Sequence, residues 1–167
     1  MGSNTLDDGA TRAALDAIRR IVQALRESSR WAERHVGLSG AQLFVLQKLA
    51  ETPGVSINDL AARTHTHQSS VSTVVTRLVR EGLVRRARAG HDGRSVTLSL
   101  SPQGRRTARR APDVPQERLI RAIEQLPAAR RRQLAGGLSQ VARAMDAAAP
   151  APAMFFEERG RAQRRAR

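Results

Sequence analysis

Apolar residues recur every three or four positions through much of this chain, the spacing typical of amphipathic helices. The first stripe predicts a helix of about 25 residues that Gly37 ends. The stripe is narrow, as in a seam between packed helices. Its apolar members are Leu15, Ile18, Val22, Leu25, Ala32 and Val36.

Three shorter helices are predicted next from their start and stop signals. Two serines stand three positions before Gln or Asp, the spacing of a capping box that begins a helix; the pairs are Ser39–Gln42 and Ser56–Asp59. Pro53-Gly54 ends the first helix, and the third runs from Gln68 to Glu81, before Gly82. We expect these side chains to face inward: Leu43, Leu46, Leu49, Ala50, Val71, Val75 and Leu78.

The period then changes to that of strands. Residues 83–88 and 95–100 alternate in side-chain polarity, and the glycine-containing segment 89–94 between them predicts the reversal of a β-hairpin. Three short helices followed by a two-stranded hairpin is the arrangement of a winged helix-turn-helix.

Helical spacing resumes after the hairpin. Ser101 begins a helix that Pro112 and Pro115 should interrupt. The helical spacing continues through residues 111–147, and we expect the Ala/Pro-rich and then basic tail, residues 148–167, to be flexible. The apolar positions of the helices are Leu119, Ile120, Ile123 and Leu126, then Leu134, Leu138, Val141 and Met145.

An excess of basic residues points to a polyanionic partner. The 167 residues include 29 Lys and Arg against 15 Asp and Glu, a formal charge of +14, and residues 39–110 alone carry 12 against 4. GC-rich codons also supply arginine, but they do not suppress acidic residues, so we expect a polyanionic partner, usually nucleic acid. The winged helix-turn-helix arrangement points to double-stranded DNA in particular.

Several function classes are disfavoured. Cysteine is absent, which excludes disulfides, thiolate metal sites and Cys nucleophiles. His65 and His67 lack a third ligand at zinc spacing, and no catalytic motif occurs, so we expect no metal, cofactor or enzymatic activity. No apolar run approaches the roughly 20 residues of a membrane span, and no signal-peptide core is present, so we expect a soluble, cytoplasmic protein without a membrane partner.

The third short helix has a polar side that suits DNA. Small polar side chains let a helix enter the major groove, and an arginine there binds guanine or phosphate, a choice that the sequence leaves open. A solvated helix face is the alternative. The residues that we expect on this side are Gln68, Ser70, Ser72, Thr73, Thr76 and Arg77.

Five segments together have the pattern of one family of regulators: Leu38-Ser39-Gly40-Ala41-Gln42-Leu43, Leu60-Ala61-Ala62-Arg63, residues 70–86, Asp92-Gly93-Arg94 and Leu100-Ser101-Pro102-Gln103-Gly104. They resemble the MarR family of bacterial transcription regulators, with its Asp-x-Arg wing motif and its Leu-Thr-x-x-Gly signature, in which Ser101 here replaces Thr. The flanking helices also match in placement.

The resemblance implies a mainly α fold with a small β-hairpin wing: a winged helix-turn-helix over residues 38–110, flanked by an N-terminal dimerisation helix, residues 11–37, and C-terminal dimerisation helices, residues 111–147. Packing of these helices within one chain is the alternative. It implies a homodimer that binds a pseudo-palindromic operator with half-sites about 34–36 Å apart. We therefore expect a sequence-specific transcriptional regulator, a ligand-responsive repressor. The alternative is a protein that binds nucleic acid or anionic surfaces through charge, without regard to sequence.

The wing has its own candidate contacts. Arg94 at the hairpin tip can enter the minor groove, and Asp92 can hold its guanidinium in place; an ordinary exposed turn pair is the alternative. We expect three further arginines to contact phosphates, namely Arg85, Arg86 and Arg88.

Regulators that resemble this one are often released from DNA by small phenolic or anionic ligands. An aromatic side chain beside arginines can stack on and pair with such an effector. Trp31 as a core residue of the dimer seam is the alternative. The candidate effector pocket comprises Arg30, Trp31, Arg34 and His35.

Overall fold

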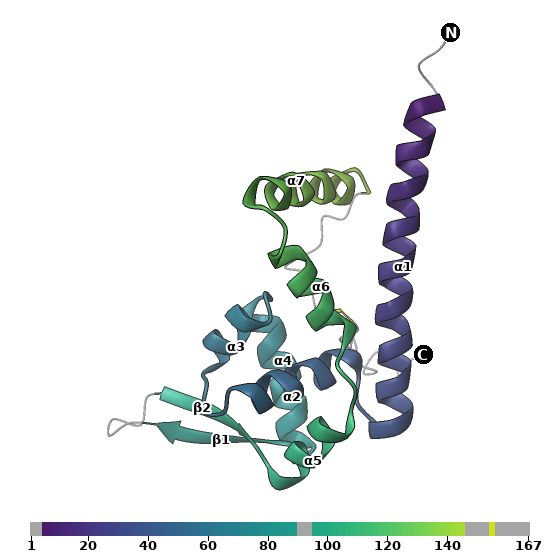
Figure 1. Ribbon diagram of the computed structural model, residues 1–167. Coiled ribbons are helices and arrows are strands. Elements are labelled where there is room, and N and C mark those ends of the chain that lie inside the picture. The colour runs from purple at the N-terminus through teal and green to yellow at the C-terminus, as the bar shows by residue number, and fades with distance from the viewer. Residues whose placement is uncertain (1–4, 90–94, 146–153, 156–167) are drawn as a thin grey trace, which may run out of the picture.

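The computed structural model describes residues 5–89, 95–145 and 154–155 (Figure 1). It confirms a mainly helical fold with one two-stranded antiparallel hairpin. The elements are α1 (Thr5–Val36), α2 (Gly40–Glu51), α3 (Ile57–Arg63), α4 (Gln68–Arg80), β1 (Val84–Ala89), β2 (Ser95–Leu100), α5 (Pro102–Arg110), α6 (Pro115–Glu124) and α7 (Ala128–Ala144).

The predicted helix boundaries are confirmed where they rest on local chemistry. Ser39 Oγ accepts a hydrogen bond from the Gln42 amide at 3.2 Å, and Gln42 Oε1 accepts one from the Ser39 amide at 2.9 Å. Ser56 and Asp59 form the second capping box. Gly82 has φ +71°, a left-handed conformation that glycine adopts without strain and that ends α4.

Helix α2 lies at the centre of the core. Leu46 is fully buried, and Phe44 and Val45, which the predicted stripe omits, are buried as well, so α2 is covered on more than one side. The expectation that Ala50 faces inward is wrong: Ala50 is exposed, because it lies in the last turn of α2 and lines a polar pocket instead of the core.

The hairpin is joined closely to the helices on either side of it. Val84 pairs with Leu100 at its base, and Leu98 exchanges backbone hydrogen bonds with the segment before α3. At the start of α5, a Cβ on Gly104 would lie 2.1 Å from the Leu83 carbonyl oxygen. Only glycine permits this approach, so Gly104 allows α5 to pack directly against the base of the wing.

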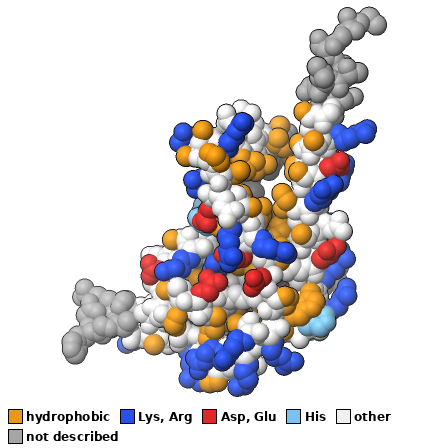
Figure 2. All heavy atoms as spheres, in the orientation of Figure 1, with side chains coloured by type: hydrophobic (Ala, Val, Ile, Leu, Met, Phe, Trp, Pro, Cys, Tyr) orange, Lys and Arg blue, Asp and Glu red, His pale blue; other side chains and the backbone are white. Residues whose placement is uncertain are grey.

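The long helices leave apolar side chains exposed. Helix α1 rises away from the core, and α7 lies across from its upper part, with apolar side chains along both (Figures 1 and 2). Leu15 is 45% exposed, and α7 has no buried residue in the single chain. The exposed members of the predicted α7 stripe are Leu134, Leu138, Val141 and Met145.

The connection from the wing to α7 is broken, as the prolines predict. Helix α5 ends at Arg110, and α6 begins with Pro115 in its first position. In the predicted tail, the structure describes Met154 and Phe155; Met154 is buried in the main core, and the remainder of residues 148–167 lies outside the described residues.

Candidate nucleic-acid interface

Helix α4 has one buried and one exposed side, as predicted. Val71, Val75 and Leu78 are fully buried, together with Val74. On the exposed side, Gln68, Thr73 and Thr76 are exposed, and Ser72 and Arg77 are half-buried. The polar side of α4 therefore faces outward, with one exception at Ser70.

The expectation that Ser70 lies on the free side is wrong, because Ser70 is buried. It precedes Val71 and lies one turn before Val74, so it falls within the apolar arc of the helix. Ser69 takes its place on the exposed side. The sequence could have identified Ser69, because it lies three residues before Ser72 and four before Thr73 and so falls on the same side of the helix.

Two threonines of α4 present a defined surface. Thr73 Oγ1 donates to the Ser69 carbonyl at 3.1 Å, and Thr76 Oγ1 donates to the Ser72 carbonyl at 2.8 Å. Each hydroxyl proton is directed at the helix backbone. The parts of the two side chains that face outward are therefore their methyl groups and oxygen lone pairs.

Arg86 connects the wing to this helix. Its Nη2 donates a hydrogen bond to Thr76 Oγ1 at 3.0 Å. Arg86 pairs in register with the buried Leu98, and Arg88 pairs with Val96, so both arginines lie on the side of the hairpin that faces the helices. Arg85 pairs with Ser99 and lies on the opposite side. The three arginines predicted as one group are thus divided between two faces.

The segment that contains the wing motif, with Asp92 and Arg94, lies outside the described residues. Their roles at the wing tip stay predictions.

The turn between α3 and α4 brings two histidines to the start of α4. His65 has φ +49°, and its Nε2 lies 2.9 Å from Glu124 Oε1 of α6. His67 is exposed and precedes the first residue of α4 without capping that helix through its side chain. Within the described residues, no group of three His, Cys, Asp or Glu side chains could hold a metal ion.

A second concentration of positive charge lies on α5. Arg105, Arg106, Arg109 and Arg110 are all exposed, and basic side chains gather over this helix in Figure 2. Arg105 Nη1 donates to the Leu100 carbonyl at 2.9 Å, which anchors it at the base of the wing.

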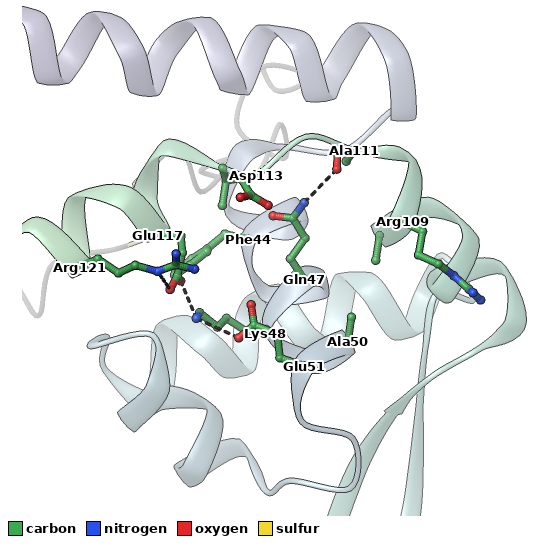
Figure 3. Close-up of a pocket in the computed structure, with 12 residues that line it drawn as sticks. Phe44, Gln47, Lys48, Ala50, Glu51, Arg109, Ala111, Asp113, Glu117 and Arg121 are labelled. Atoms are coloured by element: carbon green, nitrogen blue, oxygen red, sulfur yellow. Dashed lines mark hydrogen bonds and ion pairs between the residues drawn. The ribbon is translucent and has the colours of Figure 1, made fainter.

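A polar pocket of about 290 Å³ lies between α2, α5 and α6 (Figure 3). Lys48 Nζ pairs with Glu117 Oε2, and Arg121 Nε pairs with Glu117 Oε1 at 3.1 Å. Burial by itself raises the pKa of Glu117, but hydrogen bonds and positive charge from Lys48 and Arg121 outweigh burial and lower it. Glu117 is thus paired with Lys48 of α2 and with Arg121 of its own helix. We therefore interpret the pocket as a structural contact between α2 and α6, and we call the ion pair that links them the Lys48–Glu117 joint.

Sequence analysis did not identify this joint. Lys48 is the only lysine of the chain, and its partner is 69 positions later. Burial lowers the pKa of Lys48, but hydrogen bonds to Glu117 and Glu51 more than reverse that effect and raise it.

The four residues of the predicted effector pocket lie in the last two turns of α1. Trp31 is half-buried against the core, and the His35 ring stacks on it with centroids 4.7 Å apart. Arg30 and Arg34 are exposed. Binding of an effector by these side chains stays a prediction.

Comparison with known proteins shows which family the central part of the chain resembles. The MarR family model matches residues 36–95, from the end of α1 to the start of β2. A transcriptional repressor of the helix-turn-helix type from Mycobacterium tuberculosis is 29% identical over 114 residues, which cover 68% of this chain and 82% of the relative. The helix-turn-helix region and wing of this chain are therefore similar to those of MarR family regulators.

Two further proteins, one known by sequence and one by crystal structure, are also similar to this chain. The homoprotocatechuate degradative operon repressor of Escherichia coli is 32% identical over 102 residues, 61% of this chain and 62% of that repressor. The crystal structure of a probable transcriptional regulator from Pseudomonas aeruginosa has a TM-score of 0.51 at 28% identity and covers 81% of this chain and 98% of that one. In this chain, α3 and α4 are therefore the helix-turn-helix, and β1 and β2 are the wing.

Among the helices that the structure describes, none combines the length and the apolar character needed to cross a membrane.

Proposed function

We propose that this protein is a homodimeric transcriptional repressor of the MarR family that binds a specific duplex DNA sequence. One observation carries the proposal: the exposed polar side of α4 lies beside the arginine-bearing side of the wing, and the Arg86–Thr76 hydrogen bond joins them. A helix and a hairpin so joined can contact neighbouring parts of one duplex at the same time. The names of the relatives, which are repressors, support the same function.

Helix α4 enters the major groove in this proposal. Gln68 and Thr73 are exposed near its start, where the helix dipole also favours phosphate. Arg77 binds a guanine edge or a phosphate, and Arg86 and Arg88 bind phosphates beside the groove. Asp92 and Arg94 complete the interface at the wing tip, with Arg94 in the minor groove.

The second copy of the chain covers the exposed stripes of α1 and α7. Ile18 and Ile21 are each about two-fifths exposed, as is Leu134, and apolar stripes of this kind are stabilised when they pack against other helices. A two-fold dimer places two α4 helices at half-sites about one turn of DNA apart, which selects a pseudo-palindromic operator. Such a regulator acts in the cytoplasm, where bacterial DNA lies.

A small aromatic or anionic effector is part of the proposal. Arg30 and Arg34 are exposed and lie one position before Trp31 and His35, whose rings stack, so an anionic ring bound at the stack could pair with the arginines. An effector acts by favouring one spacing of the two α4 helices over another.

Charge supports a second candidate, a protein that binds nucleic acid or anionic surfaces without regard to sequence. The formal charge is +14, and α5 adds four exposed arginines outside the helix-turn-helix and wing. Such binding depends on counterion release alone, so it weakens equally on all sequences as salt rises.

Selection of genomic fragments at two salt concentrations separates the two candidates. A specific regulator keeps a few fragments in high salt at a large excess over the rest, whereas a charge-driven binder loses all fragments together. Equal loss of every fragment would refute the proposed function. The fragments that are retained then serve to screen for small molecules that release the protein.

A further inference from the structure

A cavity of about 330 Å³ lies between the helix-turn-helix and α6. It is lined mainly by apolar side chains, including Phe44 of α2 and Leu119 and Ile123 of α6. The opposite side is the turn between α3 and α4, residues 64–67. The cavity therefore separates the turn that positions α4 from the helix that leads to α7.

The chain's own C-terminal segment reaches this cavity. Met154 and Phe155 both line it, although they follow α7 in the sequence. Met154 is 7% exposed and belongs to the main core, whereas Phe155 is 57% exposed. One side chain of the segment is thus packed into the winged helix domain, and its neighbour remains largely in solvent.

The polar link across the cavity is weak by comparison. His65 Nε2 and Glu124 Oε1 are 2.9 Å apart, but their side chains are 58% and 49% exposed. Exposed pairs of this kind contribute little to stability. The packing of Met154, which removes an apolar side chain from water, is the stronger of the two contacts at this place.

We propose that Met154–Phe155 is an intramolecular docking segment for this cavity, and that its docking holds the turn before α4 against α6. Helix α6 leads to α7, which carries the stripe assigned to the second copy, while the turn leads to α4. The docked segment therefore couples the dimerisation helices to the DNA-reading helix. The effect on DNA rests on the proposed function; the docking itself does not.

Thiol reactivity tests the docking directly. Because the chain has no cysteine, Met154→Cys and Phe155→Cys each add a single thiol to the full chain. We expect the thiol of Met154→Cys to react with DTNB at least ~10-fold more slowly than that of Phe155→Cys, because the buried position must first undock. In a denaturing concentration of urea the two rates should become equal. Equal rates in the native protein would overturn the docking.

Hydrogen exchange tests the hold on the turn. The amides of His65 and Thr66 donate to the carbonyls of Ala62 and Ala61 at 3.2 and 3.0 Å. Met154→Ala should speed exchange of these amides, whereas Met154→Leu, which keeps the side-chain volume, should leave it close to that of the unsubstituted protein. Circular dichroism first verifies that both variants are folded. If Met154→Ala leaves exchange in the turn unchanged, the turn is held by other contacts, and that part of the proposal is wrong.

DNA binding tests the coupling. On a selected fragment with two half-sites, Met154→Ala should bind more weakly than Met154→Leu, while on a single half-site the two should bind alike. Equal binding of the two variants to the paired half-sites would refute the coupling. If the unsubstituted protein prefers no sequence, the proposed function fails instead, and the thiol and exchange results still decide the docking.

Discussion

Arg86 of the wing donates a hydrogen bond to Thr76 of α4 across 3.0 Å, so the guanidinium is already oriented beside the helix in the free chain. Arg85, its neighbour in sequence, lies on the other side of the hairpin because successive residues of a strand alternate. The two residues form a matched pair for testing which side of the wing contacts DNA.

Arg86→Ala should weaken DNA binding on every sequence and reduce the slope of log affinity against log salt by about 1, because one phosphate contact is lost. Arg85→Ala removes the same charge from the opposite side and should change the slope less. Titrations at several salt concentrations measure both slopes. An equal reduction in both variants would show that charge alone, and not the side of the hairpin, determines binding.

Lys48→Met should lower the free energy of unfolding by about 1–3 kcal/mol, since it leaves the Glu117 carboxylate without its partner on α2. Arg121→Ala removes an ion-pair partner that is 59% exposed and should cost less than about 1 kcal/mol. Urea denaturation measures both. The double variant Lys48→Met/Glu117→Leu should recover part of the loss, because the charges that it leaves without partners, Glu51 and Arg121, are both exposed. A further loss in the double variant would contradict this account of the joint.

Acid should weaken the same joint. The pKa of Glu117 is lowered in the folded chain, so its contribution to stability is present above the ordinary glutamate value of 4.5 and is lost as pH falls below that value through the lowered pKa. Urea midpoints measured from pH 6 downward should therefore fall less steeply for Glu117→Gln than for the unsubstituted protein. Parallel curves would show that Glu117 adds nothing to the acid sensitivity.

Gly104→Ala should destabilise the fold and displace the wing, because the new Cβ would lie 2.1 Å from the Leu83 carbonyl oxygen. The expected cost is about 1–3 kcal/mol, as for other forced overpacking. Gly136→Ala is the control: it lies in α7 with nothing within 4 Å of its Cβ, and it should be neutral or stabilising by up to ~1 kcal/mol. Thermal unfolding compares the two, and similar melting temperatures would refute the close approach.

Leu138→Glu should convert the protein to monomers, since Leu138 is 49% exposed on the apolar stripe of α7. Gln140→Glu adds the same charge to the same helix two residues away and should leave the dimer intact. Sedimentation velocity distinguishes the species. A monomeric unsubstituted protein would refute the dimer itself.

Much of the fold could be predicted because its signals act over one or two turns of chain. Ser39 and Gln42 define a helix start through contacts three residues apart, and Gly82 ends a helix through its own backbone angle. Ser70 could not be placed correctly, because whether a small polar residue is buried depends on how far the apolar arc extends around α4. Met154 gave no periodic signal at all, because its burial depends on a contact with the core formed elsewhere in the chain.

In the candidate site too, local features could be predicted from the sequence and contacts between distant segments could not. That α4 and the wing are adjacent followed from their order, and the alternation of strand residues would have separated Arg85 from Arg86 and Arg88. The Lys48–Glu117 joint depends on two helices meeting in space, which periodicity within each helix does not determine.

Because the helix is interrupted between α5 and α6, the connection from the wing to α7 bends at residues 111–114 and is not one continuous helix. In a dimer, the angle at residues 111–114 determines how far apart the two α4 helices stand. The Lys48–Glu117 joint lies just after that bend and holds α6 against α2. If the proposed dimer binds paired half-sites, loosening the Lys48–Glu117 pair should broaden the range of spacer lengths that the dimer accepts.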